Sequence, residues 1–294
     1  METQITVAVG KRLRLYLASQ TLPIGQSIAA NALKEWLEAM PTVGDFADDQ
    51  DAKLQTSLTA DLQRLTWRSS GETVGFFPKM QRFLAHRSIP NAARTLLAQI
   101  GEQLQPATVG MWIELMQKNL DIGCFFPGSL LLKQVLAYAS VGETRETLQT
   151  WTNQTHCNHC TEFGLSLGAG NRILTFLIPL SGSTAIEQLN LGLEAFSTFK
   201  SPALPQQVTD LLIANAKLGL LLSVWLGHAG LIKIGLLIPQ PDTELMLQLC
   251  SISGKNYDQA LAKFEGSLGV QQPTYIECQQ MATGFGVELH YDID

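Results

Sequence analysis

Charge is scarce in this sequence, and no run of basic residues occurs. Asp, Glu, Lys and Arg make up 16% of the 294 residues, and 26 acids against 20 bases give a formal net charge of −6. Binding to nucleic acid requires concentrated positive charge, so a nucleic-acid partner is not expected. The hydrophobic share of 46% in turn excludes a wholly disordered chain.

Cysteine is also rare, with five residues in the chain. An odd number suits a reducing compartment better than a framework of disulfides. The first residues lack a long apolar core followed by a small-residue cleavage site, so no signal peptide is expected. We therefore expect a cytoplasmic protein.

Short motifs of metal or nucleophile chemistry are almost missing. Residues 156–160 contain a Cys-x-x-Cys with two histidines, but a zinc site commonly needs a second pair, and the other three cysteines are isolated. We expect this segment to be a loop before a strand, and we predict no metal ligands. No Gly-x-Ser-x-Gly is present.

One apolar run, residues 218–238, is 21 residues long and would cross a bilayer as a helix. Residues 227–230 interrupt the run as a hairpin turn would, and Lys233 would be costly in hydrocarbon. Two buried strands joined by a turn explain the same residues, so no membrane span is predicted.

Four segments of the chain share one pattern: two extended stretches joined by a short turn, two large apolar residues and a proline, and then a helix. The prolines are Pro78, Pro127, Pro179 and Pro239. Proline cannot donate to a sheet and disfavours helix in the residue before it, so it suits a switch from strand to helix. The first segment predicts strands at 62–70 and 73–78, and a fifth strand pair closes the chain.

Between the hairpins, apolar residues recur at helical spacing. This spacing predicts helices at Ile24–Met40, Ala92–Leu104, Gln206–Ala216 and Tyr257–Leu268. Five repeated α-β-β-α units predict an α/β fold, a ten-stranded antiparallel barrel with helices outside, which leaves no free sheet edge. We expect residues 1–294 to form this single domain. The alternative is a set of unrelated hairpins in an α+β fold.

Side chains alternate between the two faces of a strand, and in most of these strands one face is apolar while the other is charged, aromatic or glycine. A polar lumen implies water or a ligand, because buried charges need partners. The other interpretation is a network of salt bridges without function, in which Lys233 would pair with Asp121 or Glu288. The residues expected in the lumen are Arg64, Thr66, Arg68, Trp112, Glu114, Asp121, Gly123, Glu162, Gly164, Ser166, Lys233, Gly235, Tyr275, Glu277, Gln279, Glu288, His290 and Asp292.

Three short motifs stand on these strands: Trp67-Arg68-Ser69-Ser70, the segment 231–236 around Lys233, and the closing strand 286–291. Together with the architecture, they resemble the soluble aromatic prenyltransferases, the ABBA or PT-barrel family. The size of the chain is similar to that of the cyanobactin prenyltransferases, small members that act on peptide side chains. The resemblance in architecture covers residues 20–294, whereas each motif is short.

The resemblance implies transfer of an allylic prenyl group from its diphosphate to an aromatic small molecule or a peptide side chain. Basic residues would hold the diphosphate, aromatic faces would shield the allylic cation, and a carboxylate would take the acceptor proton. The residues so implied are Arg64, Arg68, Arg172 and Lys233 for the diphosphate, Trp112, Trp225, Tyr275 and Phe125 for shielding, and Glu114, Glu277 and Glu288 for the proton, with His290 as a further base.

Several features depart from the family's pattern. Asp121 stands where a lysine is expected in the fourth strand, and the strand at 73–78 has no arginine. The sixth strand offers Leu174 and Phe176 where polar residues are usual. Acids outnumber bases in the expected lumen, and they repel a diphosphate unless Mg²⁺ bridges the two. Two hypotheses therefore stand: a prenyltransferase, with or without Mg²⁺, and an inactive barrel that binds a hydrophobic ligand or serves as an interaction protein.

Overall fold

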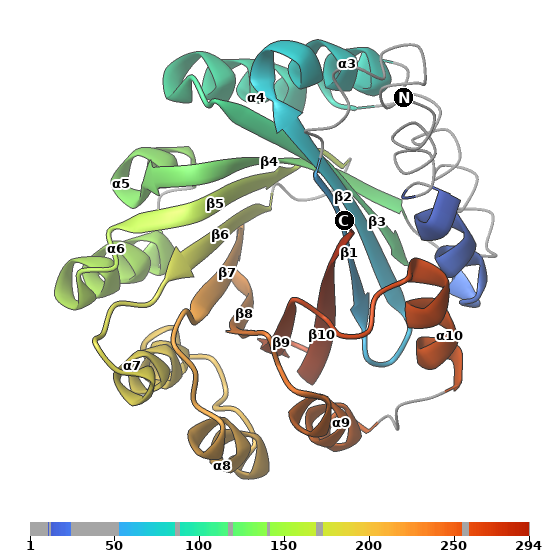
Figure 1. Ribbon diagram of the computed structural model, residues 1–294. Coiled ribbons are helices and arrows are strands. Elements are labelled where there is room, and N and C mark those ends of the chain that lie inside the picture. The colour runs from blue at the N-terminus through green and yellow to red at the C-terminus, as the bar shows by residue number, and fades with distance from the viewer. Residues whose placement is uncertain are drawn as a thin grey trace.

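The chain forms a closed barrel of ten antiparallel strands, shown in a computed structural model that describes residues 11, 13–24, 53–85, 89–116, 120–139, 142–168, 173–254 and 259–293. Each strand pairs with its neighbours in the sequence, and β1 pairs with β10 to close the ring (Figure 1). The strands are β1 Lys53–Thr59, β2 Arg64–Glu72, β3 Thr108–Met116, β4 Leu120–Leu131, β5 His159–Ser166, β6 Leu174–Pro179, β7 Leu221–Gly227, β8 Gly230–Pro239, β9 Tyr275–Met281 and β10 Gly284–Ile293. The predicted barrel is confirmed.

Helices surround the barrel on its outside (Figure 1). They are α3 Thr73–Ala85, α4 Asn91–Leu104, α5 Leu132–Val135, the 3₁₀-helix η4 Leu136–Tyr138, α6 Glu143–Thr155, α7 Ala185–Thr198, α8 Gln206–Ala214, α9 Thr243–Ile252 and α10 Gln259–Leu268. Residues 13–20 are also helical, and Trp67 on β2 donates a 3.0 Å hydrogen bond from Nε1 to Ser19 Oγ, which ties this segment to the sheet.

The hydrophobic core lies between the outer face of the barrel and the helices. Phe163 on β5 is fully buried there, and its ring lies 6.1 Å from the ring of Phe126 on β4 and 5.5 Å from that of Phe176 on β6. Tyr138 of η4 covers Phe163 from outside at 6.0 Å. Side chains alternate between the two faces of a strand. Because the apolar side chains face this layer, the alternating polar side chains point into the lumen.

The first hairpin differs from the sequence prediction. The stretch 73–78 begins helix α3, and the hairpin partner of β2 is instead β1. The apolar residues of α3 are buried at helical spacing, which favours a helix packed on the sheet over a strand. They are Phe76, Met80, Phe83 and Leu84. Pro78 lies within α3, where it removes one helical hydrogen bond.

The other predicted helices and strand ends agree more closely with the structure. Helices α4 and α8 confirm Ala92–Leu104 and, two residues shorter, Gln206–Ala216. The described part of Tyr257–Leu268 is α10, and most of Ile24–Met40 lies outside the described residues. Pro179 and Pro239 end their strands as expected. Pro127 lies inside β4, beside a shift in register to β5.

The long apolar run is a β-hairpin. Strands β7 and β8 pair with each other, and the turn lies between Gly227 and Gly230, as the sequence predicted. Among the described residues, no helix combines the length and the apolar character needed to cross a membrane.

Replacing Phe163 by alanine should lower the free energy of unfolding by about 3–5 kcal/mol, because it leaves a cavity in the layer between sheet and helices. The matched control is Thr161→Ala, which changes an exposed residue two positions away on the same face of β5. Its effect should stay within about 0.5 kcal/mol. Urea unfolding measures both, and equal stabilities for the two variants would show that this face is not the core.

Candidate functional site in the barrel lumen

The lumen contains a cavity of about 80 Å³, counted as the space open to the centres of water-sized molecules. One water needs about 10–15 Å³ on this measure, so the cavity holds several waters or one small organic group. Side chains from all of the strands except β4 line it. They are Ser57, Thr66, Arg68, Trp112, Glu114, Glu162, Thr175, Leu177, Ser223, Trp225, Lys233, Leu237, Glu277, Glu288 and His290.

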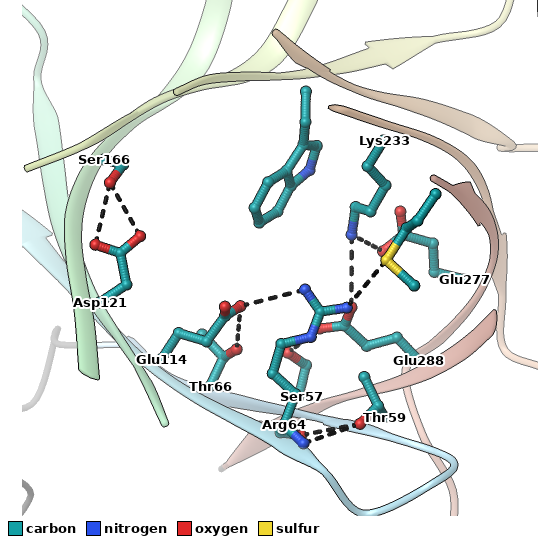
Figure 2. Close-up of polar contacts among 12 residues, drawn as sticks. Ser57, Thr59, Arg64, Thr66, Glu114, Asp121, Ser166, Lys233, Glu277 and Glu288 are labelled. Carbon is teal, nitrogen blue, oxygen red and sulfur yellow. Dashed lines mark hydrogen bonds and ion pairs between the residues drawn. The ribbon is translucent and has the colours of Figure 1, made fainter. Parts of the chain in front are cut away.

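Lys233 is the centre of a buried ion-pair network on one wall of the lumen (Figure 2). Its Nζ lies 3.1 Å from Glu277 Oε2 and 3.5 Å from Glu288 Oε2. Lys233 is 2% exposed, Glu277 2% and Glu288 6%. The ammonium also lies over the ring of Trp225, 4.3 Å from its centroid, so a cation–π contact adds to the two ion pairs.

Neighbouring residues hold the two glutamates in place. Ser57 on β1 donates a 2.6 Å hydrogen bond to Glu288 Oε1, and His290 Nε2 lies 3.3 Å from Glu277 Oε2. Gly235 on β8 provides the space for the Glu277 carboxylate, because a Cβ at that position would lie 2.4 Å from Oε1. Any other residue there would push Glu277 away from Lys233.

Arg64 and Glu114 form a second, looser pair at the bottom of the view in Figure 2. Arg64 Nη1 lies 3.8 Å from Glu114 Oε2, and Thr66 Oγ1 donates to the same oxygen at 3.5 Å. The other end of the guanidinium lies 3.6 Å from the sulfur of Met281. Glu114 is therefore buried at 7% exposure with only long contacts to its partners.

Arg68 forms the third pair, with Glu162 on β5. Its guanidinium lies 4.1 Å from the centroid of the Phe125 ring. Phe125 in turn lies across Gly110, where a Cβ would overlap the ring at 2.2 Å. The Phe125 ring therefore lies over the neighbouring strand, and the absence of a side chain at Gly110 is what permits it.

Asp121 on β4 points into the lumen from the side opposite Lys233 (Figure 2). Ser166 Oγ lies 3.0 and 3.1 Å from its two carboxylate oxygens, and the backbone N–H of Ile122 donates to Oδ1 at 2.9 Å. Among the described residues, no cation pairs with Asp121. The hypothesis that Lys233 pairs with Asp121 is wrong, whereas the alternative partner, Glu288, is confirmed.

Solved structures with the same architecture are aromatic prenyltransferases. The 6-dimethylallyltryptophan synthase of Micromonospora olivasterospora superposes with a TM-score of 0.61 at 10% identity, over 98% of this chain and 97% of that one. The 5-dimethylallyltryptophan synthase of Streptomyces coelicolor gives 0.62 at 14% identity, over 98% and 94%. AnaPT of Neosartorya fischeri gives 0.61 at 10%, over 95% and 91%. The chain has the PT-barrel fold of the ABBA-type aromatic prenyltransferases.

Sequence comparisons add one relative of this PT barrel. A PH domain-containing protein of Dictyostelium discoideum is 31% identical over 261 residues, which are 87% of this chain and 57% of that protein. The chain thus spans little more than half the length of this curated relative. No protein-family model matches the sequence.

Of the twelve residues that the resemblance implied for the site, eight line the cavity. The cavity wall includes Arg68, Trp112, Glu114, Trp225, Lys233, Glu277, Glu288 and His290. Arg64 contacts that wall through Glu114, whereas Tyr275 lies at the start of β9 and does not line the cavity. Arg172 lies outside the described residues.

The sequence did not predict two parts of the cavity wall, one on β6 and one on β1. On β6, Leu174 and Phe176 pack in the outer core, and Thr175 and Leu177 face the cavity instead, the reverse of the expected parity. This strand is apolar on both faces, so alternation gave no signal. Ser57 was missed with β1 as a whole, although the alternation of leucine with Gln, Ser and Thr at 54–59 is itself a strand signal.

Burial and charge act in opposite directions on the pKa values of the lumen acids. Burial alone would raise the pKa of Glu277 and Glu288, but Lys233 and His290 hold both below the ordinary value. For Glu114, burial dominates over the attraction of Arg64 and raises the pKa to about 7. Burial also raises the pKa of Asp121, against the hydrogen bond from Ser166.

A divalent cation fits this wall poorly. Glu277, Glu288 and His290 could each offer one ligand atom, and these atoms lie within 4.8 Å of one another. However, the ammonium of Lys233 stands among the same carboxylates and already supplies the positive charge that an ion would bring. The arrangement therefore does not suit Mg²⁺, and we assign no step to one.

Replacing Lys233 by methionine should destabilise the protein by about 3–5 kcal/mol, because two buried carboxylates lose their counter-charge. Adding Glu277→Gln and Glu288→Gln to that variant should recover more than half of the loss. Lys200→Met is the control, since it breaks an ion pair with Glu143 at the exposed surface and should leave stability nearly unchanged. Chemical denaturation checks all three, and a stable Lys233→Met variant would show that the network is not needed for folding.

Glu114 should make stability fall as pH rises from about 4.5 to about 7. Its pKa is near 7 in the folded protein against an ordinary 4.5, so the folded state keeps a proton that the unfolded chain releases. Glu114→Gln should remove this fall and stabilise the protein by about 1–3 kcal/mol at pH 8, with little gain at pH 5. Denaturation at the two pH values measures it. An equal loss of stability at both would mean that Arg64 requires the ionised carboxylate.

Proposed function

We propose that this PT barrel binds a hydrophobic small molecule in its lumen, uncharged or positively charged, and does not transfer prenyl groups. One observation carries the proposal: of the four cations that the resemblance implies for a diphosphate, Arg172 lies outside the described residues, and each of the other three is already paired with a carboxylate of the lumen. The pairs are Arg64 with Glu114, Arg68 with Glu162, and Lys233 with Glu277 and Glu288.

The charge balance supports this proposal. A diphosphate is bound by cations whose charge is free to meet it. Here an entering diphosphate would have to displace carboxylates that are fixed by their own hydrogen bonds, such as the one from Ser57 to Glu288. The displaced carboxylates would then be buried beside it without partners, which costs several kcal/mol per charge.

The shape and lining of the cavity also support a single small ligand. Its volume of about 80 Å³ suits one small ring rather than a prenyl donor and an aromatic acceptor side by side. Trp112 and Trp225 give it aromatic faces, and Leu177 and Leu237 give it apolar ones. Such a surface binds a compact apolar or aromatic group.

Prenyl transfer is the second candidate, and the fold favours it. The M. olivasterospora neighbour was crystallised with DMASPP and Trp, and the S. coelicolor enzyme likewise. In this candidate Arg64, Arg68 and Lys233 would open their pairs to receive the diphosphate of the donor. Trp112, Trp225 and Phe125 would shield the allylic cation, and one of Glu114, Glu277 and Glu288 would take the proton of an aromatic or peptide acceptor.

One experiment separates the two candidates. The protein is incubated with dimethylallyl or geranyl diphosphate, with and without Mg²⁺, and with a panel of indoles, phenols and peptides. We expect no prenylated product by mass spectrometry and no rise in melting temperature with either diphosphate. Uncharged aromatic compounds such as indole should raise the melting temperature, because a ligand that binds only the folded state stabilises it.

Two matched variants test whether the ligand binds in the lumen. Thr175→Leu enlarges a side chain on the cavity wall and should abolish the shift with indole. Thr161→Leu makes the same change at an exposed position of the neighbouring strand and should leave the shift intact. A prenylated product from the unmodified protein would replace the proposal with the second candidate. A shift that survives Thr175→Leu would place the binding elsewhere.

A further inference from the structure

The lumen carries more negative than positive charge. Five described carboxylates face three cations there. The carboxylates are Glu114, Asp121, Glu162, Glu277 and Glu288, and the cations are Arg64, Arg68 and Lys233. The excess is two carboxylates: Lys233 serves two glutamates, Arg68 serves Glu162, and Arg64 is the one described cation left for the remaining pair of acids.

That remaining pair is Glu114 and Asp121, which lie directly opposite each other on β3 and β4. In Figure 2 the Glu114 carboxylate is turned toward Arg64 and the Asp121 carboxylate toward Ser166, and of the two only Glu114 lines the cavity. Glu114 has only the 3.8 Å contact to Arg64, and Asp121 has hydrogen bonds but no cation among the described residues. Like charges directly opposite on neighbouring strands repel, and Arg64, at 3.8 Å from Glu114, is the one described cation that this pair shares.

Two buried side chains of the lumen have polar atoms without hydrogen-bond partners among the described residues, which indicates a bound ligand or bound water. Glu277 lines the cavity and is 98% buried, yet its Oε1 has no hydrogen-bond partner among the described residues. Gln279, two positions along the same face of β9, is fully buried with both amide atoms unpartnered in the described part of the chain. Buried polar atoms are rarely left in this state, and ligands or ordered waters commonly satisfy them.

Aromatic faces stand beside these acids. Trp112 lies two residues before Glu114 on the same face of β3, and its ring lies across Gly123 of β4. Trp225 completes the aromatic lining and already holds one ammonium, that of Lys233, over its ring. Acids and aromatic rings around one small cavity are the surroundings that recognise organic cations.

We propose that the ligand of this lumen is an organic cation with an aromatic or apolar body, whose ammonium group lies beside Glu114, on the side of the lumen where Asp121 faces Glu114 from β4. This inference rests on the proposed binding function. The body of the ligand would lie against Trp112 and Trp225, where room remains in the cavity. The ammonium would supply one of the two positive charges that the described lumen acids lack.

Binding of such a ligand should release protons near neutral pH. A positive charge beside Glu114 favours its ionised form and therefore lowers its pKa from about 7. At pH 7 roughly half of the Glu114 side chains carry a proton that the cation would displace. The charged or titratable groups that face Glu114 are Arg64 and Arg68 on β2, Asp121 on β4, Glu162 on β5, Lys233 on β8, Glu277 on β9, and Glu288 and His290 on β10.

Three probes of one shape test the inference: 2-phenylethylammonium, 2-phenylethanol and phenylacetate, which are cationic, neutral and anionic. Isothermal titration calorimetry at pH 7, in two buffers of different ionisation enthalpy, gives both affinity and proton release. We expect the cation to bind at least tenfold more tightly than the alcohol and to release about half a proton per molecule bound. Phenylacetate should not bind.

Two variants and one control locate the effect. Glu114→Gln should weaken binding of the cation roughly ten- to a hundredfold, as loss of a charge-assisted contact does, leave the alcohol unaffected and abolish the proton release. Asp121→Asn removes a lumen charge that does not line the cavity, so it should weaken binding of the cation by a smaller factor and also leave the alcohol unaffected. The control, Asp292→Asn, changes an acid that hydrogen-bonds Gln55 outside the cavity and should alter nothing.

The outcomes distinguish this inference from the function on which it rests. If the alcohol binds as tightly as the cation, the inference is overturned and the proposed binding function stands. If none of the three probes binds, the proposed function itself is overturned. If phenylacetate binds most tightly, the lumen selects anions, which contradicts both and supports the second candidate.

Discussion

The burial of Lys233 between two glutamates is the constraint on which the lumen depends. A lone buried ammonium or carboxylate is expensive, so the three side chains must be held together or the barrel must open to water. The sequence meets this requirement with small neighbours: Gly235 leaves space for Glu277, and Ser57 fixes Glu288. A network that is satisfied internally in this way leaves little positive charge for an anion that enters from outside.

Elsewhere in the wall, too, a large side chain lies against a glycine of the neighbouring strand. Trp112 lies across Gly123, and Phe125 across Gly110, so each ring occupies the place of an absent side chain on the neighbouring strand. Rings laid flat along the wall keep the centre of the barrel open, whereas rings pointing inward would fill it. The open centre and the surplus of acid around it arise from one arrangement of residues along β2 to β5.

The sequence allowed prediction of the barrel because its outer face obeys a simple rule. A helix-covered face must be apolar, and the polar parity of β2, β3, β5, β9 and β10 then follows. The rule gave no information on β6, which is largely apolar on both faces, so it did not predict that Thr175 and Leu177 line the cavity. It also could not choose a partner for Lys233, since Asp121 and Glu288 are both expected to face the lumen. The order of strands in the closed barrel decides: β10 with Glu288 is two strands from β8, whereas β4 with Asp121 is four strands away.

Fold and ligand are therefore set by different residues in this protein. The outer face and the helices maintain the barrel at 10–14% identity to dimethylallyltryptophan synthases, because any well-packed set of apolar side chains suffices there. The lumen face carries little of that packing, so its charges can change without loss of the fold. The barrel therefore keeps the architecture of the aromatic prenyltransferases while each described lumen cation, Arg64, Arg68 and Lys233, is paired with a carboxylate of its own lumen.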